Sequence, residues 1–251
     1  MTASLGGMAV FVTGAGRGLG RSTAQHLATL GAVLGVADID GASAEETAAL
    51  IRAAGGMAHG YALDVARRDA FLSAAAEFAG RTGRIDAMLN NATHLHYEKI
   101  EDVREEMLDR MVGTGLAGAV WGVQALLAHY DPARGGAIVN YTSPVAYKGY
   151  PTTAIYSAIK GAILTLTHTL AAELGPRNIR VNAVAPGSVP TPGALAIVDQ
   201  AEYERRARTI PLRRLGSEAD VAQAIAFLLG PEAAFVNGAV LHVDGGIVAS
   251  A

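Results

Sequence analysis

Three residues near the middle of the chain could handle a proton together. Tyr156 and Lys160 are separated by three residues, which places both side chains on one face of a helix. A cation within ~4–6 Å of a phenol favours the phenolate and can lower the tyrosine pKa from ~10 by about 1 to 3 pH units. Ser143 lies upstream, directly after the apolar run 136–142, which predicts a buried strand. These residue types predict acid–base chemistry on an alcohol or a carbonyl group.

The tyrosine–lysine spacing also occurs on ordinary solvated helix faces, so the pair alone is weak evidence. It is, however, the only Y-x-x-x-K pattern in the chain. The strand before Ser143 would deliver that hydroxyl to its carboxyl end, where open parallel sheets bind their ligands. The pattern and its context together favour a site.

Composition narrows the classes of protein that the chain could be. It has 251 residues, of which 51% are hydrophobic and 17% charged, with a formal net charge of −3. This length and composition predict one domain with a sizeable core and no nucleic-acid partner. There are no cysteines, which excludes disulfides, thiolate zinc sites and cysteine nucleophiles.

The amino-terminal sequence predicts no targeting to a membrane. It lacks a basic segment followed by a long apolar run, and no apolar stretch approaches the ~18 residues of a membrane span. We therefore expect a soluble, cytoplasmic protein with no membrane partner.

Short runs rich in β-branched residues alternate with alanine-rich helical segments along the whole chain. Alternation of this kind predicts parallel strands joined by right-handed helical crossovers, with helices on both faces of one sheet. We expect seven strands, at 9–13, 32–37, 58–63, 87–90, 137–142, 180–185 and 239–243.

A glycine-rich loop follows the first predicted strand and precedes a helical run from Arg21 to Leu30. Glycines let the backbone approach a phosphate, and a helix amino terminus adds free amides and the positive end of its dipole. The spacing is G-x-x-x-G-x-G rather than G-x-G-x-x-G, and a glycine-rich turn without a ligand is the alternative. The loop contains Gly14, Arg17, Gly18, Leu19 and Gly20.

Asp38 ends the second predicted strand, about 20 residues beyond the loop. A carboxylate there can accept hydrogen bonds from the adenosine ribose, and its charge would repel a 2′-phosphate. Arg17 favours the phosphate, but Ile39 supplies no second basic group. The sequence therefore favours NAD over NADP, with a simple strand-end cap as the alternative role of Asp38.

With these motifs in order along nearly its whole length, the chain resembles the short-chain dehydrogenase/reductase family. The resemblance implies a single-domain, doubly wound Rossmann fold over residues 1–251, with a mobile substrate segment around 190–210. It also implies a homotetramer built partly through helices around 108–130 and 153–174. Ser143, Tyr156 and Lys160 match the family's catalytic residues.

Several further residues match positions where the family contacts its cofactor. By this resemblance Asp64 and Val65 lie at the adenine, Asn91 and Ala92 end the fourth strand, and one loop holds the nicotinamide carboxamide. That loop carries Pro186, Gly187, Val189 and Thr191, and Asp244-Gly245-Gly246 resembles the family's C-terminal signature.

The resemblance implies hydride transfer between NAD(H) and an alcohol or ketone. Ser143 would hold the substrate hydroxyl and Tyr156 would take its proton. Lys160 would bind the nicotinamide ribose and keep the pKa of Tyr156 low. The alternative is a dinucleotide-binding sensor or scaffold with little catalysis.

Two positions depart from the family pattern. The helix at 108–124 usually carries an asparagine that supports the lysine through water, and Gly115 stands there. Glycines at 113, 115 and 118 each cost up to ~1 kcal/mol inside a helix, which predicts a local bend or a close backbone approach. Thr114 is a candidate substitute, although we expect its side chain to point away from position 115. Thr93 replaces the family's glycine and would narrow the substrate side.

Two other patterns imitate functional sites. Tyr141 and Lys148 have the spacing of a divergent family of enoyl reductases, but Tyr141 belongs to the predicted strand, so we interpret the pair as chance. His94, His96 and Glu98 could be imagined as metal ligands, but no further ligand converges on them, and we expect them to line a pocket mouth.

The region after residue 190 is the expected substrate side. Residues 191–198 are mostly small or apolar, and Tyr147 and Tyr150 add bulk near Ser143, so a moderately hydrophobic alcohol or ketone fits best. An arginine cluster follows, for which surface salt bridges or subunit contacts are favoured over recognition of an acidic group. Its members are Arg205, Arg206, Arg208, Arg213 and Arg214.

Overall fold

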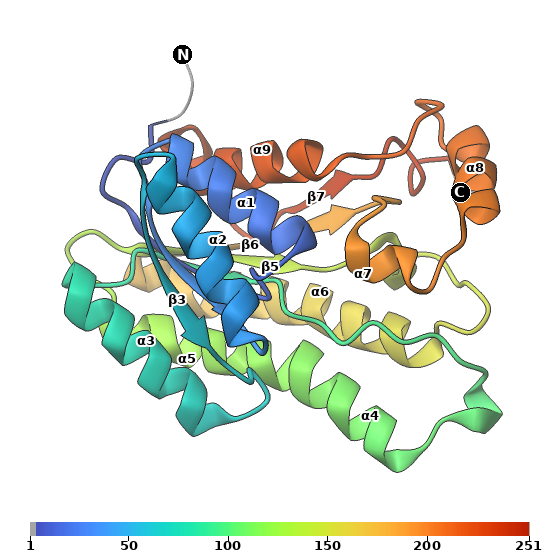
Figure 1. The fold of residues 1–251 in the computed structure, drawn as a ribbon, viewed down its shortest axis with the longest axis horizontal. Coiled ribbons are helices and arrows are strands. Elements are labelled where there is room, and N and C mark those ends of the chain that lie inside the picture. The colour runs from blue at the N-terminus through green and yellow to red at the C-terminus, as the bar shows by residue number, and fades with distance from the viewer. Residues whose placement is uncertain (1–3, 251) are drawn as a thin grey trace.

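Seven parallel strands form one sheet in the computed structural model, which describes residues 4–250 (Figure 1). Their order is β3-β2-β1-β4-β5-β6-β7. The strands are β1 (Ala9–Thr13), β2 (Val33–Asp38), β3 (Met57–Ala62), β4 (Ala87–Asn90), β5 (Gly136–Tyr141), β6 (Ile179–Pro186) and β7 (Val240–Val243). The predicted sheet is confirmed, and every strand end lies within one residue of its predicted place.

Helices cover both faces of the sheet because successive side chains of each buried strand point to opposite faces. Along β1, Val10 and Val12 pack with one set of helices, and Ala9 and Phe11 with the other. The first set is α1 (Gly18–Thr29), α2 (Gly41–Ala53) and α9 (Glu218–Leu229). The second is α3 (Arg68–Thr82), α5 (Gly118–His129) and α6 (Ala154–Leu174). This is the expected doubly wound arrangement.

The helix with the three glycines contains a π turn. It runs from α4 (Glu105–Val112) through the π turn η2 (Gly113–Ala117) into α5. A Cβ at Gly115 would lie 2.8 Å from Cγ2 of Ile159, and one at Gly118 would lie 3.0 Å from Cγ2 of Val65. Of the two predicted alternatives, the close approach is confirmed, because neither contact leaves room for a larger residue.

The same continuous helix is the one candidate for a membrane span within residues 4–250. By length and composition, Glu105–His129 is long and apolar enough, with a mean hydropathy of 1.5 over its most apolar window. From the sequence alone we expect no such segment. Val123, Ala125 and Leu126 are buried against the sheet and α3, so packing in the core accounts for much of this apolar face.

The remaining elements lie in connections between the main strands and helices. α7 (Pro192–Leu195) and α8 (Gln200–Thr209) follow β6, beyond the carboxyl ends of β6 and β7 (Figure 1). The short 3₁₀ turns are η1 (Ile100–Asp102), η3 (Pro144–Ala146), η4 (Gly175–Arg177) and η5 (Pro231–Ala233). The substrate segment expected around 190–210 is therefore mainly helical.

Candidate active site

Two hydrogen bonds join the carboxyl end of β5 to α6. The hydroxyl of Thr142 donates to the carbonyl oxygen of Lys160 at 2.8 Å, and the Lys160 ammonium donates to the carbonyl oxygen of Tyr141 at 2.8 Å. Ser143 follows immediately and caps η3, with Oγ accepting from the Val145 amide. The backbone therefore fixes the serine and the lysine relative to each other.

The three residues predicted to handle a proton meet at this junction. Tyr156 is the third residue of α6, and the Ser143 side chain is near enough to its phenol to affect the pKa of Tyr156. Nζ of Lys160 lies 5.5 Å from the centroid of the Tyr156 ring. The expected helix face is confirmed, and the hydroxyl, phenol and ammonium form one contiguous site.

The pKa of Tyr156 differs from the sequence expectation. Burial raises it above its ordinary value, the nearby Tyr97 phenol adds to the rise, and the Ser143 side chain opposes it. The protein residues alone thus favour the protonated phenol. The low pKa that the sequence predicted for Tyr156 is therefore wrong for these residues, because loss of hydration outweighs the effects that lower the pKa.

Lys160 is strongly affected by the same burial. Its side chain lies in the core, and removal from water lowers the pKa of its amine from 10.5 to about 8. Both the proton donor and the cation that supports it are therefore perturbed by desolvation. Such perturbed pairs are common at functional sites.

Tyr97 belongs to the site although sequence reasoning passed over it. Its ring meets the Tyr156 ring edge-on, with centroids 5.7 Å apart. Burial raises the pKa of Tyr97, and the Arg206 guanidinium on α8 opposes that rise. Tyr97 therefore contacts the Tyr156 ring and also feels the charge of Arg206 on α8. No periodic pattern marks it in the sequence, since it lies in the irregular segment after β4.

The contacts of Tyr141 and of His96 account for the two other patterns noted in the sequence. The Tyr141 hydroxyl is buried and paired with the Thr23 hydroxyl at 3.2 Å, whereas Lys148 is exposed. His96 contacts the Glu98 carboxylate at 3.3 Å and its ring stacks with that of His94. Within residues 4–250, no group of three or more His, Asp or Glu side chains could hold a metal ion.

The glycine-rich loop lies between β1 and α1, where the order of strands reverses. Gly14 and Gly18 have φ of +64° and +58°, a conformation that side chains disfavour. A Cβ at Gly14 would lie 2.9 Å from Cα of Ala92. The N-cap of α1 is the exposed Arg17, whose side chain does not cap the helix. The first amides of α1 can therefore donate hydrogen bonds to a ligand.

Asn91 fastens this loop to the end of β4. Its Nδ2 donates to the carbonyl oxygens of Thr13 and Gly14 at 2.8 and 2.9 Å. The Thr13 hydroxyl accepts from the amides of Asn91 and Ala92. Asn91 and Ala92, both predicted cofactor residues, therefore shape the loop through the backbone.

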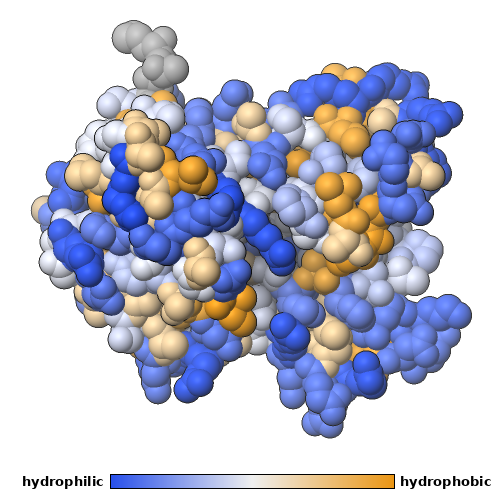
Figure 2. Space-filling view, in the orientation of Figure 1, coloured by the Kyte–Doolittle hydropathy of each residue, from blue (hydrophilic) through white to orange (hydrophobic). Residues whose placement is uncertain are grey.

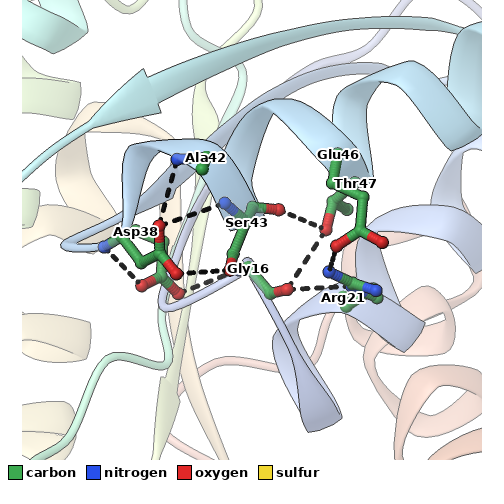
Figure 3. A network of polar contacts seen from close by, with 8 residues as sticks. Gly16, Arg21, Asp38, Ala42, Ser43, Glu46 and Thr47 are labelled. Atoms are coloured by element: carbon green, nitrogen blue, oxygen red, sulfur yellow. Dashed lines mark hydrogen bonds and ion pairs between the residues drawn. The ribbon is translucent and has the colours of Figure 1, made fainter.

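Asp38 holds the far side of the loop (Figure 3). One carboxylate oxygen accepts from the Gly16 amide at 2.9 Å and the other accepts from the Asp40 amide at 3.1 Å. Arg21 donates to the Gly16 carbonyl oxygen and pairs with Glu46. The predicted acidic residue thus sits directly against the glycine loop, with its negative charge kept there by backbone donors.

The other predicted cofactor residues surround the same edge of the sheet. Asp64 accepts from the Ala66 amide at 3.0 Å, and the buried Val65 packs on α5. A Cβ at Gly18 would lie 3.4 Å from Cβ of Thr191, so the start of α7 faces the glycine loop. Two of the remaining members belong to α1, where Leu19 packs on the core and Gly20 is buried. The others follow β6: Pro186 ends that strand, the Gly187 amide donates to the Val243 carbonyl oxygen, and Val189 is buried.

These residues fit a dinucleotide. The glycine cradle, the uncapped α1 amino terminus and the carboxylate of Asp38 provide sites for a pyrophosphate and a ribose. Thr191 lies beside Gly18 of this cradle, since a Cβ added at Gly18 would be in van der Waals contact with it. When bound, a nicotinamide cofactor would supply the acceptor or donor of a hydride.

Comparison with known proteins agrees with this geometry. A family model described as Enoyl-(Acyl carrier protein) reductase matches residues 14–248. The chain is 36% identical over 246 residues to 2-(S)-hydroxypropyl-CoM dehydrogenase 3 of Xanthobacter autotrophicus, and the match covers 96% of each chain. The chain belongs to the short-chain dehydrogenase/reductase family.

Two further relatives place this short-chain dehydrogenase/reductase among oxidoreductases that bind nicotinamide cofactors. It is 36% identical to cyclopentanol dehydrogenase of Comamonas sp., with 96% of this chain and 97% of the relative covered. The structure of 7α-hydroxysteroid dehydrogenase complexed with NADH and 7-oxo glycochenodeoxycholic acid superposes with a TM-score of 0.94 at 29% identity. The match covers 98% of this chain and 96% of that chain.

The face that carries the strand ends of this short-chain dehydrogenase/reductase is hollowed. Figure 2 shows the hollow between the side formed by α1 and α2 and the side formed by α7 and α8, with apolar residues over α7. Leu195 and Ile197 are 50% and 41% exposed there. The side of the hollow next to α7 is therefore suited to apolar groups.

Proposed function

We propose that the chain catalyses hydride transfer between NAD(H) and a secondary alcohol or its ketone, with a moderately hydrophobic substrate. The observation that carries the proposal is the Lys160 ammonium 5.5 Å from the centroid of the Tyr156 ring, with Ser143 at the adjoining end of β5. Hydroxyl, phenol and cation together can hold a carbonyl oxygen and move one proton.

Each residue has a separate part in the proton transfer. During oxidation, Ser143 holds the substrate oxygen and Tyr156 accepts its hydroxyl proton. During reduction, the phenol returns the proton to the same oxygen. Because burial raises the pKa of Tyr156, its protonated form is favoured at neutral pH, which suits reduction, while rising pH promotes oxidation. Lys160 stabilises the phenolate by charge.

The preference for NAD rests on Asp38. Its carboxylate lies against the Gly16 amide, at the place where the resemblance puts the adenosine ribose. Ribose hydroxyls can donate to such a carboxylate, whereas a phosphate would be repelled by it. The adjacent Ile39 is 69% exposed and adds no positive charge.

The substrate class rests on the apolar side of the hollow and on the aromatic ring of Tyr97 beside Tyr156. The names and titles of the three compared relatives contain a 2-hydroxypropyl group, cyclopentanol and a 7-hydroxysteroid, each a secondary alcohol. The enoyl-reductase pattern of Tyr141 and Lys148 is not available for catalysis, since the Tyr141 hydroxyl is engaged with Thr23. The Y-x-x-x-K site remains, and its residue types suit an alcohol or a ketone.

We also propose an oligomeric state, a moving segment and a cellular location for the enzyme. The apolar helix Glu105–His129 and α6 would pack against other subunits in a homotetramer, because less than half of the most apolar window of the former is buried within one chain. The segment at 190–210, containing α7 and α8, would move over the substrate. A cytoplasmic location suits this assembly, and neither a membrane nor nucleic acid is needed.

A panel of secondary alcohols and ketones tests the proposal. Each compound is assayed with NAD(H) and with NADP(H) by following the absorbance of the reduced nicotinamide. Turnover of at least one apolar secondary alcohol with NAD is expected. Tight NADH binding without turnover of any compound would contradict the proposal and support a sensor or scaffold.

A further inference from the structure

The arginines of the cluster at 205–214 differ in how fully their guanidinium groups are engaged. Arg205 donates two hydrogen bonds to the Glu202 carboxylate, and Arg214 donates two to the Asp220 carboxylate. Both side chains are more than half exposed, so these are surface salt bridges of the kind that the sequence favours for the cluster. Arg206 does not follow this pattern.

Arg206 has unused donors although much of its side chain is buried. A guanidinium carries five N–H donors in a planar fork. Among the contacts of residues 4–250, the side chain donates only through Nε, to the Glu202 carboxylate at 2.7 Å. It is 32% exposed, so a ligand can reach it from the solvent. Nη1 and Nη2 therefore form a fork of the shape that binds an oxyanion through two parallel hydrogen bonds.

The Arg206 side chain lies close to the proposed catalytic residues. Its guanidinium carbon is 5.9 Å from the centroid of the Tyr203 ring, which is buried. Its charge also opposes the rise in the pKa of Tyr97. The Tyr97 ring in turn meets the Tyr156 ring, with centroids 5.7 Å apart. A ligand group bound at Arg206 would thus be separated from the Tyr156 phenol by the Tyr97 side chain.

The charges around Arg206 favour a negative ligand group. Arg205 and Arg206 share the single carboxylate of Glu202, so one positive charge is left over. The pKa of Tyr97 responds to Arg206 and to no carboxylate among residues 4–250. An anion at this end of the hollow would therefore be attracted, whereas a cation would be repelled.

The neighbouring surface of the hollow is apolar. Leu195 at the end of α7 and Ile197 just beyond it are 50% and 41% exposed. Figure 2 shows the apolar residues over α7 next to the hydrophilic surface of α8, which carries Arg206. A ligand that contacts both surfaces has an apolar body and one charged end.

We propose that the substrate is a secondary alcohol or ketone whose apolar body ends in an oxyanion such as a carboxylate, and that Arg206 binds this group. Nη1 and Nη2 donate to the two oxygens, while the Glu202 carboxylate holds Nε and so orients the fork. The inference rests on the proposed function, because it specifies the substrate of the same hydride transfer.

Matched pairs of a charged and a neutral alcohol test this inference on the wild-type protein. Straight-chain carboxylates and sulfonates with a hydroxyl on the penultimate carbon are assayed with NAD, beside the methyl esters of the same acids. Chain length is varied, because the charged end must reach Arg206. At the best length, kcat/KM for the acid should exceed that for its ester by about 10- to 100-fold, mainly through KM. Equal values at every length would overturn the inference.

Two variants identify the residue that causes the preference. Arg206→Met keeps the apolar stem and removes the fork, so the preference for the acid over its ester should fall to less than about threefold. Arg208→Met removes an exposed guanidinium from the same helix and should keep the preference. A preference that survives in Arg206→Met, or one lost equally in both variants, would overturn the inference. The wild-type comparison remains decisive if Arg206→Met does not fold.

The inference and the proposed function can fail separately. Turnover of neutral alcohols without any preference for acids would overturn only the inference. If no alcohol or acid is oxidised, the proposed function fails, and calorimetry then decides the inference. The NADH complex should bind an oxo acid about tenfold more tightly than its methyl ester, and Arg206→Met should abolish the difference. Equal affinities in the wild type would overturn the inference.

Discussion

The cofactor end and the substrate end of the strand edge are built differently. At the cofactor end, polar side chains are paired with backbone groups: Asp38 accepts from Gly16, and Asn91 donates to Thr13. At the substrate end, Tyr97 and Tyr156 meet through their rings, and an oxygen of Glu98 is buried without a partner. The first end is shaped before any ligand arrives, whereas the second retains polar groups that a substrate can engage.

This difference indicates which residues determine cofactor binding and which determine the chemistry and the substrate fit. Backbone-paired residues at strand ends fix cofactor geometry, so their replacement should change which cofactor binds. Apart from Lys160, which the resemblance also assigns to the nicotinamide ribose, side chains on α6 and in the loops carry the chemistry and the substrate fit, so their replacement should leave cofactor binding largely intact. Substitutions at each end test whether cofactor binding and chemistry can be changed independently.

The largest effect is expected at Lys160. Lys160→Met should lower kcat by about 10²- to 10⁴-fold, because the phenolate of Tyr156 loses its supporting cation. The same variant should be more stable than the wild type at neutral pH, since it removes a buried charge. Steady-state kinetics and thermal unfolding measure the two effects.

The pH dependence of that stabilisation follows from the pKa of Lys160. The unfolded lysine keeps its proton up to about pH 10.5 and the folded one only up to about pH 8. Wild-type stability therefore rises with pH between these values, and the advantage of the variant should shrink over the same window. The exposed Lys148→Met serves as the control. An advantage that grows above pH 8 would contradict the assignment.

A smaller effect is expected at the cofactor end. Asp38→Asn should reduce the preference for NAD over NADP by about 10- to 100-fold, since the charge that repels a 2′-phosphate is removed. Dissociation constants of the two reduced cofactors measure this ratio. Asp40→Asn, which changes a neighbouring carboxylate that caps α2, should keep the preference. A ratio altered equally in both variants would argue against a specific role for Asp38.

At the substrate end, Tyr97→Ala should raise KM for a good secondary alcohol by about tenfold, because an aromatic wall beside Tyr156 is lost. Tyr97→Phe keeps the ring and should stay close to wild type. Cofactor affinity should be unchanged in both variants. A weaker affinity for NADH would show that the two ends are coupled through Tyr97.

The smallest effect concerns the π turn. Gly115→Ala should destabilise the fold by about 1–3 kcal/mol, because the added Cβ would lie 2.8 Å from Ile159. Gly161→Ala on α6 is the matched control, since a Cβ there meets nothing within 4 Å. That variant should be stabilised by up to about 1 kcal/mol. Equal destabilisation of both variants would remove the special role of the turn.

The sheet and the cofactor end were largely predictable from the sequence. Buried parallel strands give short apolar runs, and the loop after β1 and Asp38 after β2 follow in chain order, so topology brings them together. The serine, tyrosine and lysine were predictable for the same reason, because one strand end and one helix turn position all three.

The rest of the site depends on contacts that no local pattern encodes. Tyr97 and Tyr156 meet although they lie in distant parts of the chain, and the π turn sets Gly115 against Ile159 of α6. The pKa of Tyr156 was predicted with the wrong sign, since spacing shows a neighbouring charge but not the burial that outweighs it. Packing in three dimensions determines these features.

The most direct test of the separation between the two ends is a paired measurement on Tyr156→Phe. Turnover of an active secondary alcohol and the dissociation constant of NADH are measured on the same preparation, with Tyr141→Phe as the matched tyrosine control. We predict that turnover falls by about 10²- to 10⁴-fold while NADH affinity stays within about threefold of wild type. Retained turnover in Tyr156→Phe, or a loss explained by weaker NADH binding, would contradict the account.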